Sequence, residues 1–152
     1  MKILILTISS IMLSLLLSSS ALATYLVLPA NTATIDEYYD SCTVNYDGTV
    51  TGTSTCSLYF PIRIETGKTL STITAYYYDN SGSQSMTVYF YKETQSSDAN
   101  TLLDYTTDIS TSASIQSSSI SYGSSLSSSY AYFLMVVLGN GTELRGIKLY
   151  YY

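Results

Sequence analysis

Residues Tyr130–Leu138, with the sequence YAYFLMVVL, decide the fold class of this chain. Successive side chains of a β-strand point to opposite faces, so these residues divide into two alternating sets. One set begins at Tyr130 and ends at Leu138, the other begins at Ala131 and ends at Val137, and both are apolar throughout. We therefore predict a strand in the middle of a sheet.

The same alternation on either side of this segment predicts two hairpins. A turn at Gly139–Thr142 leads into a strand over Leu144–Tyr151. A second turn at Asp79–Ser83 joins a strand over Leu70–Tyr78 to one over Gln84–Lys92. Shorter strands are predicted at Tyr25–Leu28, Cys42–Tyr46, Ser57–Ile64, Thr101–Thr107 and Ser112–Ser121.

Together these segments amount to about eight or nine strands, separated by turn-forming residues at intervals of about 8 to 15 residues. No stretch after residue 23 shows a sustained helical period, and no repeat of fixed length is present. We therefore predict an all-β fold, an antiparallel β-sandwich of jelly-roll or Greek-key type. The serine-rich segment Ser117–Ser129 contains Ile120, Tyr122 and Leu126, which indicates a loop and edge strand of the domain and not a linker.

The first 23 residues have the composition of a secretory signal peptide. Lys2 supplies the positive charge, Ile3–Leu17 is an apolar stretch, and Ala21–Ala23 is a small-residue cleavage site. The alternative is an uncleaved membrane anchor, which needs about 20 apolar residues, and this run is shorter. We predict that residues 24–152 form a single exported domain without a membrane span. Its destination would be the extracellular space or the cell surface, with the periplasm as another option.

Cys42 and Cys56 are the only cysteines in the chain. In an oxidising compartment, a pair so close in sequence is expected to form a disulfide. A two-residue turn at Asp47–Gly48 would place Cys42 opposite Thr53, three residues short of Cys56. Either Gly52 marks a β-bulge or the bridge joins a neighbouring strand.

Part of the chain resembles a hairpin that recurs in secreted bacterial β-sandwich proteins of unknown function. Its mark is the run Tyr76-Tyr77-Tyr78-Asp79-Asn80, and the resemblance covers roughly residues 58–152. The matching segments are Phe60–Ile62, Leu70–Ser81, Met86–Tyr91, Ser129–Leu134 and Leu144–Leu149. The resemblance implies a secreted β-sandwich, and it implies no activity because none is assigned to that family.

The chain lacks the side chains of most hydrolytic sites. It contains no histidine, its cysteines are expected to be oxidised, and no Gly-x-Ser-x-Gly or phosphate-binding glycine motif occurs. Paired carboxylates, as in glycoside hydrolases, are the remaining catalytic device. The candidates for such a pair are Asp36, Glu37, Asp40, Asp79, Asp104 and Asp108. The sequence brings no two of these together, and we predict a protein that is not an enzyme.

Asp36, Glu37 and Asp40 form the densest acidic cluster in the chain. Carboxylates and loop carbonyls are the ligands that Ca²⁺ prefers, so these residues are candidates for a structural calcium site. Their spacing does not match the Asp-x-Asp-x-Asp-Gly loop, and a solvated acidic turn is the alternative interpretation. No other cofactor is indicated.

The chain contains 17 tyrosines and no tryptophan. Tyrosine has a flat apolar face and a polar tip, so exposed tyrosines can stack on sugar rings or anchor a protein partner. The candidate ligand contacts are Tyr76, Tyr77, Tyr78, Asp79 and Asn80. In a strand Tyr76 and Tyr78 share one face and Tyr77 takes the other, so the three cannot all be exposed. The alternative is that these rings pack within the sheet.

We predict a binding or adhesion module for an extracellular glycan or protein. The net charge of −5 argues against nucleic acid and anionic membranes as partners, since both attract basic patches. The main alternative is a structural subunit of a surface layer or filament. A small outer-membrane barrel is a further alternative, although Ser112–Ser121 offers no apolar row for lipid. In a eukaryotic secretory pathway, Asn140 of Asn140-Gly141-Thr142 would accept a glycan.

Overall fold

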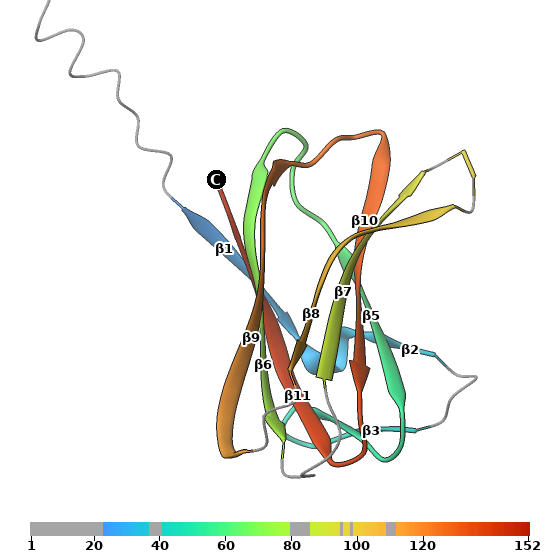
Figure 1. Cartoon of the computed structure of the whole chain (residues 1–152), viewed down its shortest axis with the longest axis vertical. Helices are drawn as coiled ribbons and strands as arrows, with labels where there is room; N and C mark the ends of the chain where they lie inside the picture. Colours follow the sequence, from blue (N-terminus) through green and yellow to red (C-terminus); the bar gives the residue numbers. More distant parts are fainter. Residues whose placement is uncertain (1–22, 37–40, 80–85, 95, 98, 109–111) are drawn as a thin grey trace, which may run out of the picture.

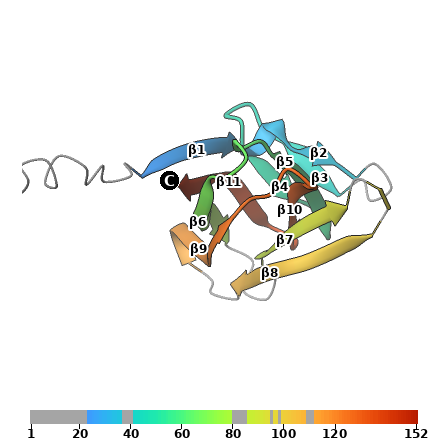
Figure 2. The same ribbon diagram turned by 90° about the horizontal axis from the view of Figure 1, so that it is seen from above.

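The computed structural model describes residues 23–36, 41–79, 86–94, 96–97, 99–108 and 112–152. Within them the chain forms two antiparallel β-sheets that pack face to face as a sandwich (Figures 1 and 2), so the predicted fold class is confirmed. A single turn of 3-10 helix, η1 (Ala30–Thr32), is the only helical element in these ranges. No helix among these residues is long and apolar enough to cross a membrane. Apart from Ala23, the predicted signal peptide lies outside the described residues.

Eleven strands make up the two sheets in the described part of the chain. The six-stranded sheet contains β1 (Thr24–Pro29), β3 (Cys42–Val44), β4 (Val50–Gly52), β6 (Thr69–Asp79), β9 (Ser112–Ser125) and β11 (Thr142–Tyr151). The five-stranded sheet contains β2 (Thr34–Ile35), β5 (Cys56–Ile62), β7 (Met86–Thr94), β8 (Asn100–Asp108) and β10 (Tyr130–Leu138).

The order of the strands is that of a jelly roll. The six-stranded sheet runs β3-β4-β11-β6-β9, with β1 also paired to β11, and the five-stranded sheet runs β2-β5-β10-β7-β8. From β4 to β11, the chain crosses to the other sheet at every connection except the one from β7 to β8. This alternation is the jelly-roll form of the predicted sandwich.

The two predicted hairpins are wrong, although their strands are right. β6 and β7 lie in different sheets, and so do β10 and β11. The turn Gly139–Thr142 therefore arches over the core, where Gly141 N–H donates to the carbonyl of Gly52 (2.8 Å). An alternating pattern records only which side chains are buried. Strands that face each other across a core show the same pattern as strands that pair within one sheet.

The core lies between the sheets, and the prediction of a central strand is confirmed, because β10 lies between β5 and β7. Leu134, Val136 and Leu138 of β10 are fully buried against the other sheet. Burying one such side chain stabilises the fold by about 1.5–3 kcal/mol. The serine-rich strand β9 lies at an edge of its sheet, also as predicted.

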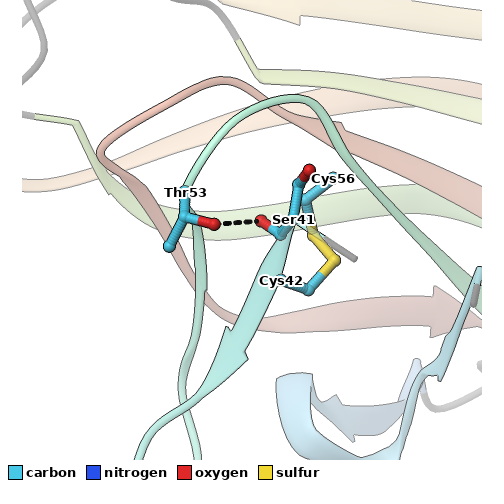
Figure 3. Close-up of a disulfide and its surroundings, with 4 residues drawn as sticks. All are labelled: Ser41, Cys42, Thr53 and Cys56. Atoms are coloured by element: carbon cyan, nitrogen blue, oxygen red, sulfur yellow. Dashed lines mark hydrogen bonds between the residues drawn. A yellow bond between two sulfur atoms is a disulfide. The ribbon is translucent and has the colours of Figure 1, made fainter. Parts of the chain in front are cut away.

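Cys42 and Cys56 form the predicted disulfide, with 5.2 Å between their Cα atoms. Cys42 begins β3 in the six-stranded sheet and Cys56 begins β5 in the five-stranded sheet, so the bridge links the two sheets. Figure 3 shows it beside the hydrogen bond that Thr53 Oγ1 donates to the carbonyl of Ser41 (3.1 Å). Of the two alternatives at Gly52, the bridge to another strand is therefore correct, but that strand lies in the opposite sheet.

The turn between β3 and β4 is one residue longer than predicted. Asn45 N–H donates to the carbonyl of Thr49 (2.9 Å), which leaves Tyr46–Gly48 in the turn. Gly48 has a φ of 85°, a conformation that glycine adopts without strain. As a result Cys42 lies opposite Gly52, one position away from the predicted partner.

The carboxylate of Asp47 closes this turn by accepting hydrogen bonds from Thr49 Oγ1 (2.8 Å) and Thr49 N–H (3.1 Å). These bonds hold the pKa of Asp47 below its ordinary value of 3.8. Because the folded-state pKa is depressed, the carboxylate stabilises the turn above its unfolded-state pKa, and this contribution is lost as the pH falls through the folded-state value.

We expect an NMR titration of the Thr49→Val variant to show a raised pKa for Asp47. The Thr43→Val control should leave it unchanged, and an equal pKa in both variants would contradict the assignment.

Candidate binding surface

Aromatic side chains cover the outer face of the five-stranded sheet. In β5, β7 and β10 the core-facing side chains are those of even-numbered residues, so the odd-numbered ones point outwards. In β8 the outward residue opposite Tyr89 is Tyr105. We call the resulting group the aromatic face, and it consists of Tyr59, Tyr89, Tyr91, Tyr105 and Phe133.

The rings of the aromatic face form a continuous row across β5, β10, β7 and β8. Tyr91 and Phe133 pair directly and stack, with centroids 5.2 Å apart and an interplanar angle of 14°. Tyr89 and Tyr105 also pair and stack, at 6.0 Å and 25°. The row is completed by Tyr89 and Tyr91 at 6.2 Å and by Tyr59 and Phe133 at 6.4 Å. Because each ring contacts a neighbour, the row is held as one rigid surface.

The aromatic face is accessible to solvent and is flanked by polar groups at both ends. Tyr105 is 59% exposed, and the other rings are partly exposed. At one end the hydroxyls of Thr87 and Thr107 lie 3.1 Å apart. At the other end Glu93 and Asn100 face each other across β7 and β8. An apolar platform therefore lies between hydrogen-bonding groups, of which Thr107, Glu93 and Asn100 are open to a ligand and Thr87 is buried.

A shallow pocket of about 440 Å³ lies at the end of the row formed by Tyr59 and Phe133. Its walls include Pro61 together with the polar side chains of Glu93 and Asn100. The pocket thus combines ring faces with a carboxylate and an amide, the groups that bind and orient a polar ligand with apolar surfaces.

A second group of rings supports β7 and β10 from the core side. Phe90 packs edge-to-face on Tyr122 of β9, with centroids 4.9 Å apart, and lies 6.0 Å from Tyr132 of β10. Burial raises the pKa of Tyr122. These contacts join the end of the five-stranded sheet to the opposite sheet, so the strands that carry the aromatic face are fixed from behind.

The predicted cluster at Tyr76–Asn80 does not form one surface. Tyr77 and Asp79 are fully buried, where no ligand on the outer face can reach them, and Asn80 lies outside the described residues. Tyr76 is 36% exposed and, with the partly exposed Tyr78, lies on the outer face of the six-stranded sheet. Sequence reasoning chose these residues because they are adjacent in the chain, and strand geometry separates them.

The candidate calcium site can be placed only in part, because Glu37 and Asp40 lie outside the described residues. Asp36 is half-buried, and its N–H donates to the carbonyl of Ser57 (3.3 Å). Among the residues that the structure describes, no three His, Cys, Asp or Glu side chains are grouped so as to hold a metal ion.

The candidate glycosylation site is only partly accessible. Asn140 is exposed in the turn between β10 and β11, whereas Thr142 of the same sequon is buried.

No protein-family model and no curated protein matches this chain. Among solved structures, the C-terminal CBM6 of LamC, a marine laminarinase from Zobellia galactanivorans, has a TM-score of 0.51 and 11% identity, over 83% of this chain and 98% of that chain. The xylan-binding module CBM15 has a TM-score of 0.50 and 8% identity, over 84% and 95%. The Podospora anserina GH26-CBM35 β-(1,4)-mannanase has a TM-score of 0.52 and 15% identity, over 82% of this chain and 27% of that one. At these identities the likeness shows a shared fold.

Proposed function

We propose that this protein is an exported, non-enzymatic binding module that holds a carbohydrate on the aromatic face. The observation that carries the proposal is the continuous row of rings, partly exposed on one rigid sheet. A sugar ring presents C–H groups between its hydroxyls, so its faces pack against flat aromatic side chains. The tyrosine hydroxyls and the polar groups beside the row would bind the sugar hydroxyls.

The polar groups are placed where they would orient such a ligand. Glu93 and Asn100 border the pocket beside Tyr59 and Phe133, and they supply acceptors and donors for sugar hydroxyls. Because these groups converge on one end of the row, we infer that affinity comes from the stacked rings and that selectivity comes from this pocket.

The solved structures of the same fold guide the choice of ligands to test. By name they are a CBM6 of a laminarinase, a xylan-binding module and a mannanase with a CBM35. We infer a glycan as the partner of this chain because its own aromatic face has the chemistry that such a ligand requires. A protein partner would also pack against aromatic side chains, and it is the alternative to be tested.

Export is part of the proposal. The disulfide between Cys42 and Cys56 is of the kind that persists in oxidising compartments. Residues 1–23 would supply the signal peptide, and residues 24–152 would be the mature domain. We place this domain outside the cytoplasm, either secreted or at the cell surface, with the periplasm as a further option.

A binding screen of the mature chain tests the proposed function. Laminarin, β-1,4-mannan and xylan would each be cast into a native gel, with serum albumin as the non-binding control. We expect at least one polysaccharide to retard the protein, and we expect no release of reducing sugar in parallel incubations. Release of reducing sugar would indicate a glycoside hydrolase. Normal mobility in all three gels, followed by no signal on a broad glycan array, would contradict the proposal.

A structural subunit of a surface layer or filament is the second candidate. The observation that favours it is β9, which runs for 14 residues and among the described strands pairs only with β6. A long edge strand can pair with another copy of the chain. We expect sedimentation of the mature chain to show a monomer over about a hundredfold range of concentration. Polymers at low concentration together with no glycan binding would favour the subunit.

A further inference from the structure

A second surface with rings and a cation lies on the outer face of the six-stranded sheet, on the other side of the sandwich from the aromatic face. Its members come from three neighbouring strands, since Tyr25 pairs with Tyr150, Val27 with Lys148 and Tyr76 with Gly146. Tyr25 is 58% exposed and Val27 is 52% exposed. Tyrosine and valine exposed to this degree on a sheet face are open to a partner.

Lys148 is held in place by the two rings next to it. Its Nζ lies 4.0 Å from the centroid of the Tyr25 ring and 4.9 Å from that of Tyr150. A hydrogen bond to Tyr150 raises the pKa of Lys148, so the side chain stays charged. The cation is therefore fixed before any ligand binds, which lowers the entropy cost of using it in binding.

A hollow of about 180 Å³ lies beside this cation. Val27 and Tyr76 form its apolar walls, and Gly146, which pairs with Tyr76, lines it as well. Arg145 borders the hollow as well, although it also forms an ion pair with Glu143 (3.4 Å). Both cations border the hollow, and Lys148 is the one whose neighbours are aromatic, whereas Arg145 is paired with a carboxylate.

We propose that this hollow is a second binding site, specific for an acidic sugar residue. The sugar ring would pack against Tyr76 and Val27, and its carboxylate or sulfate group would bind the ammonium of Lys148. The site lies on a different sheet from the aromatic face and does not depend on it. Because the chain as a whole carries a net charge of −5, it repels polyanions in general, and binding must arise from a local site.

Binding to charged and uncharged polysaccharides of known composition tests this site. The probes are polygalacturonate, which carries carboxylates, dextran sulfate, which carries sulfates, and dextran, which carries neither. We expect the mature chain to bind at least one of the two polyanions and not dextran. The Lys148→Met variant should lose about tenfold in affinity, as expected for a lost charged hydrogen bond. The Lys68→Met variant, which changes the net charge equally but lies at the turn before β6, should bind like the parent.

A second variant keeps the test decisive if Lys148→Met unfolds by releasing β1. Tyr76→Ala removes a wall of the hollow and leaves the contacts of Lys148 with Tyr25 and Tyr150 in place, and it should weaken the same polyanion. Thermal unfolding would establish that each variant is folded. If neither polyanion bound the parent protein, the proposal of an acidic-sugar site would be overturned. It would also be overturned if the Lys148→Met and Tyr76→Ala variants both bound the polyanion as tightly as the parent. Loss of neutral-glycan binding alone would leave this site intact and count only against the aromatic face.

Discussion

Replacing Tyr91 and Phe133 together by alanine is expected to abolish most carbohydrate binding. These rings stack at 5.2 Å in the middle of the aromatic face, and their removal divides the row into two separate ends. Buried or stacked aromatic contacts are commonly worth 1–2 kcal/mol or more each, so we expect the affinity to fall by about a hundredfold. Isothermal titration with the polysaccharide identified in the gel screen measures this change.

The control for this variant is Tyr46→Ala. Tyr46 lies in the turn between β3 and β4, is fully exposed, and is not part of the aromatic face. Its removal takes away an exposed tyrosine without touching the row, so affinity should stay within a factor of about two. Equal losses in both variants would show that binding does not use the aromatic face, and unchanged binding in the double variant would show the same.

Loss of the disulfide is expected to have the largest effect on stability. The bridge between Cys42 and Cys56 closes a short loop, and it should stabilise the folded chain by about 3 kcal/mol. We expect urea unfolding of the Cys42→Ala, Cys56→Ala double variant to show a midpoint lowered in proportion to this loss in the free energy of unfolding. The bridge connects two sheets, so its loss should also loosen the contact between β3 and β5.

Chemical reduction of the parent protein separates the cross-link from the cysteine side chains. Cys56 is fully buried, so alanine at this position removes packing as well as the bridge. Reduction keeps both sulfur atoms and breaks only the bond between them. A reduced protein as stable as the oxidised one would contradict the assigned role, whatever the double variant showed.

The longer strands could be predicted from the sequence, whereas the neighbours of each strand in its sheet could not. β10 was recognisable because its alternating apolar sets are a local property, and β9 was recognisable because Ile120 and Tyr122 interrupt its serines. β2 and β4 span only two and three residues, too short to show a period. The pairing of β10 with β5 and β7 depends on contacts across the whole domain, and the turn residues at Gly139–Thr142 are suitable for a hairpin and for an arch alike.

The candidate site could not be predicted for the same reason, namely that it depends on which strands are neighbours. Tyr59, Tyr91 and Phe133 are far apart in the sequence and meet only because β5, β10 and β7 are neighbours in the jelly roll. The apolar outward set of β10, which includes Phe133, is part of this surface, but from the sequence alone it predicts only a central strand. Tyr77, in contrast, attracted attention through its neighbours in the chain, and it is buried in the core.

The position of β11 has a consequence for the order in which this protein folds. β11 pairs with β1, β4 and β6, so the six-stranded sheet is incomplete until β11 itself has been synthesised. Pairing between strands so distant in sequence is slow, because long loops must close before any contact is gained. We therefore expect the domain to fold only after β11 has been synthesised, so that the proposed export step would act on an unfolded chain.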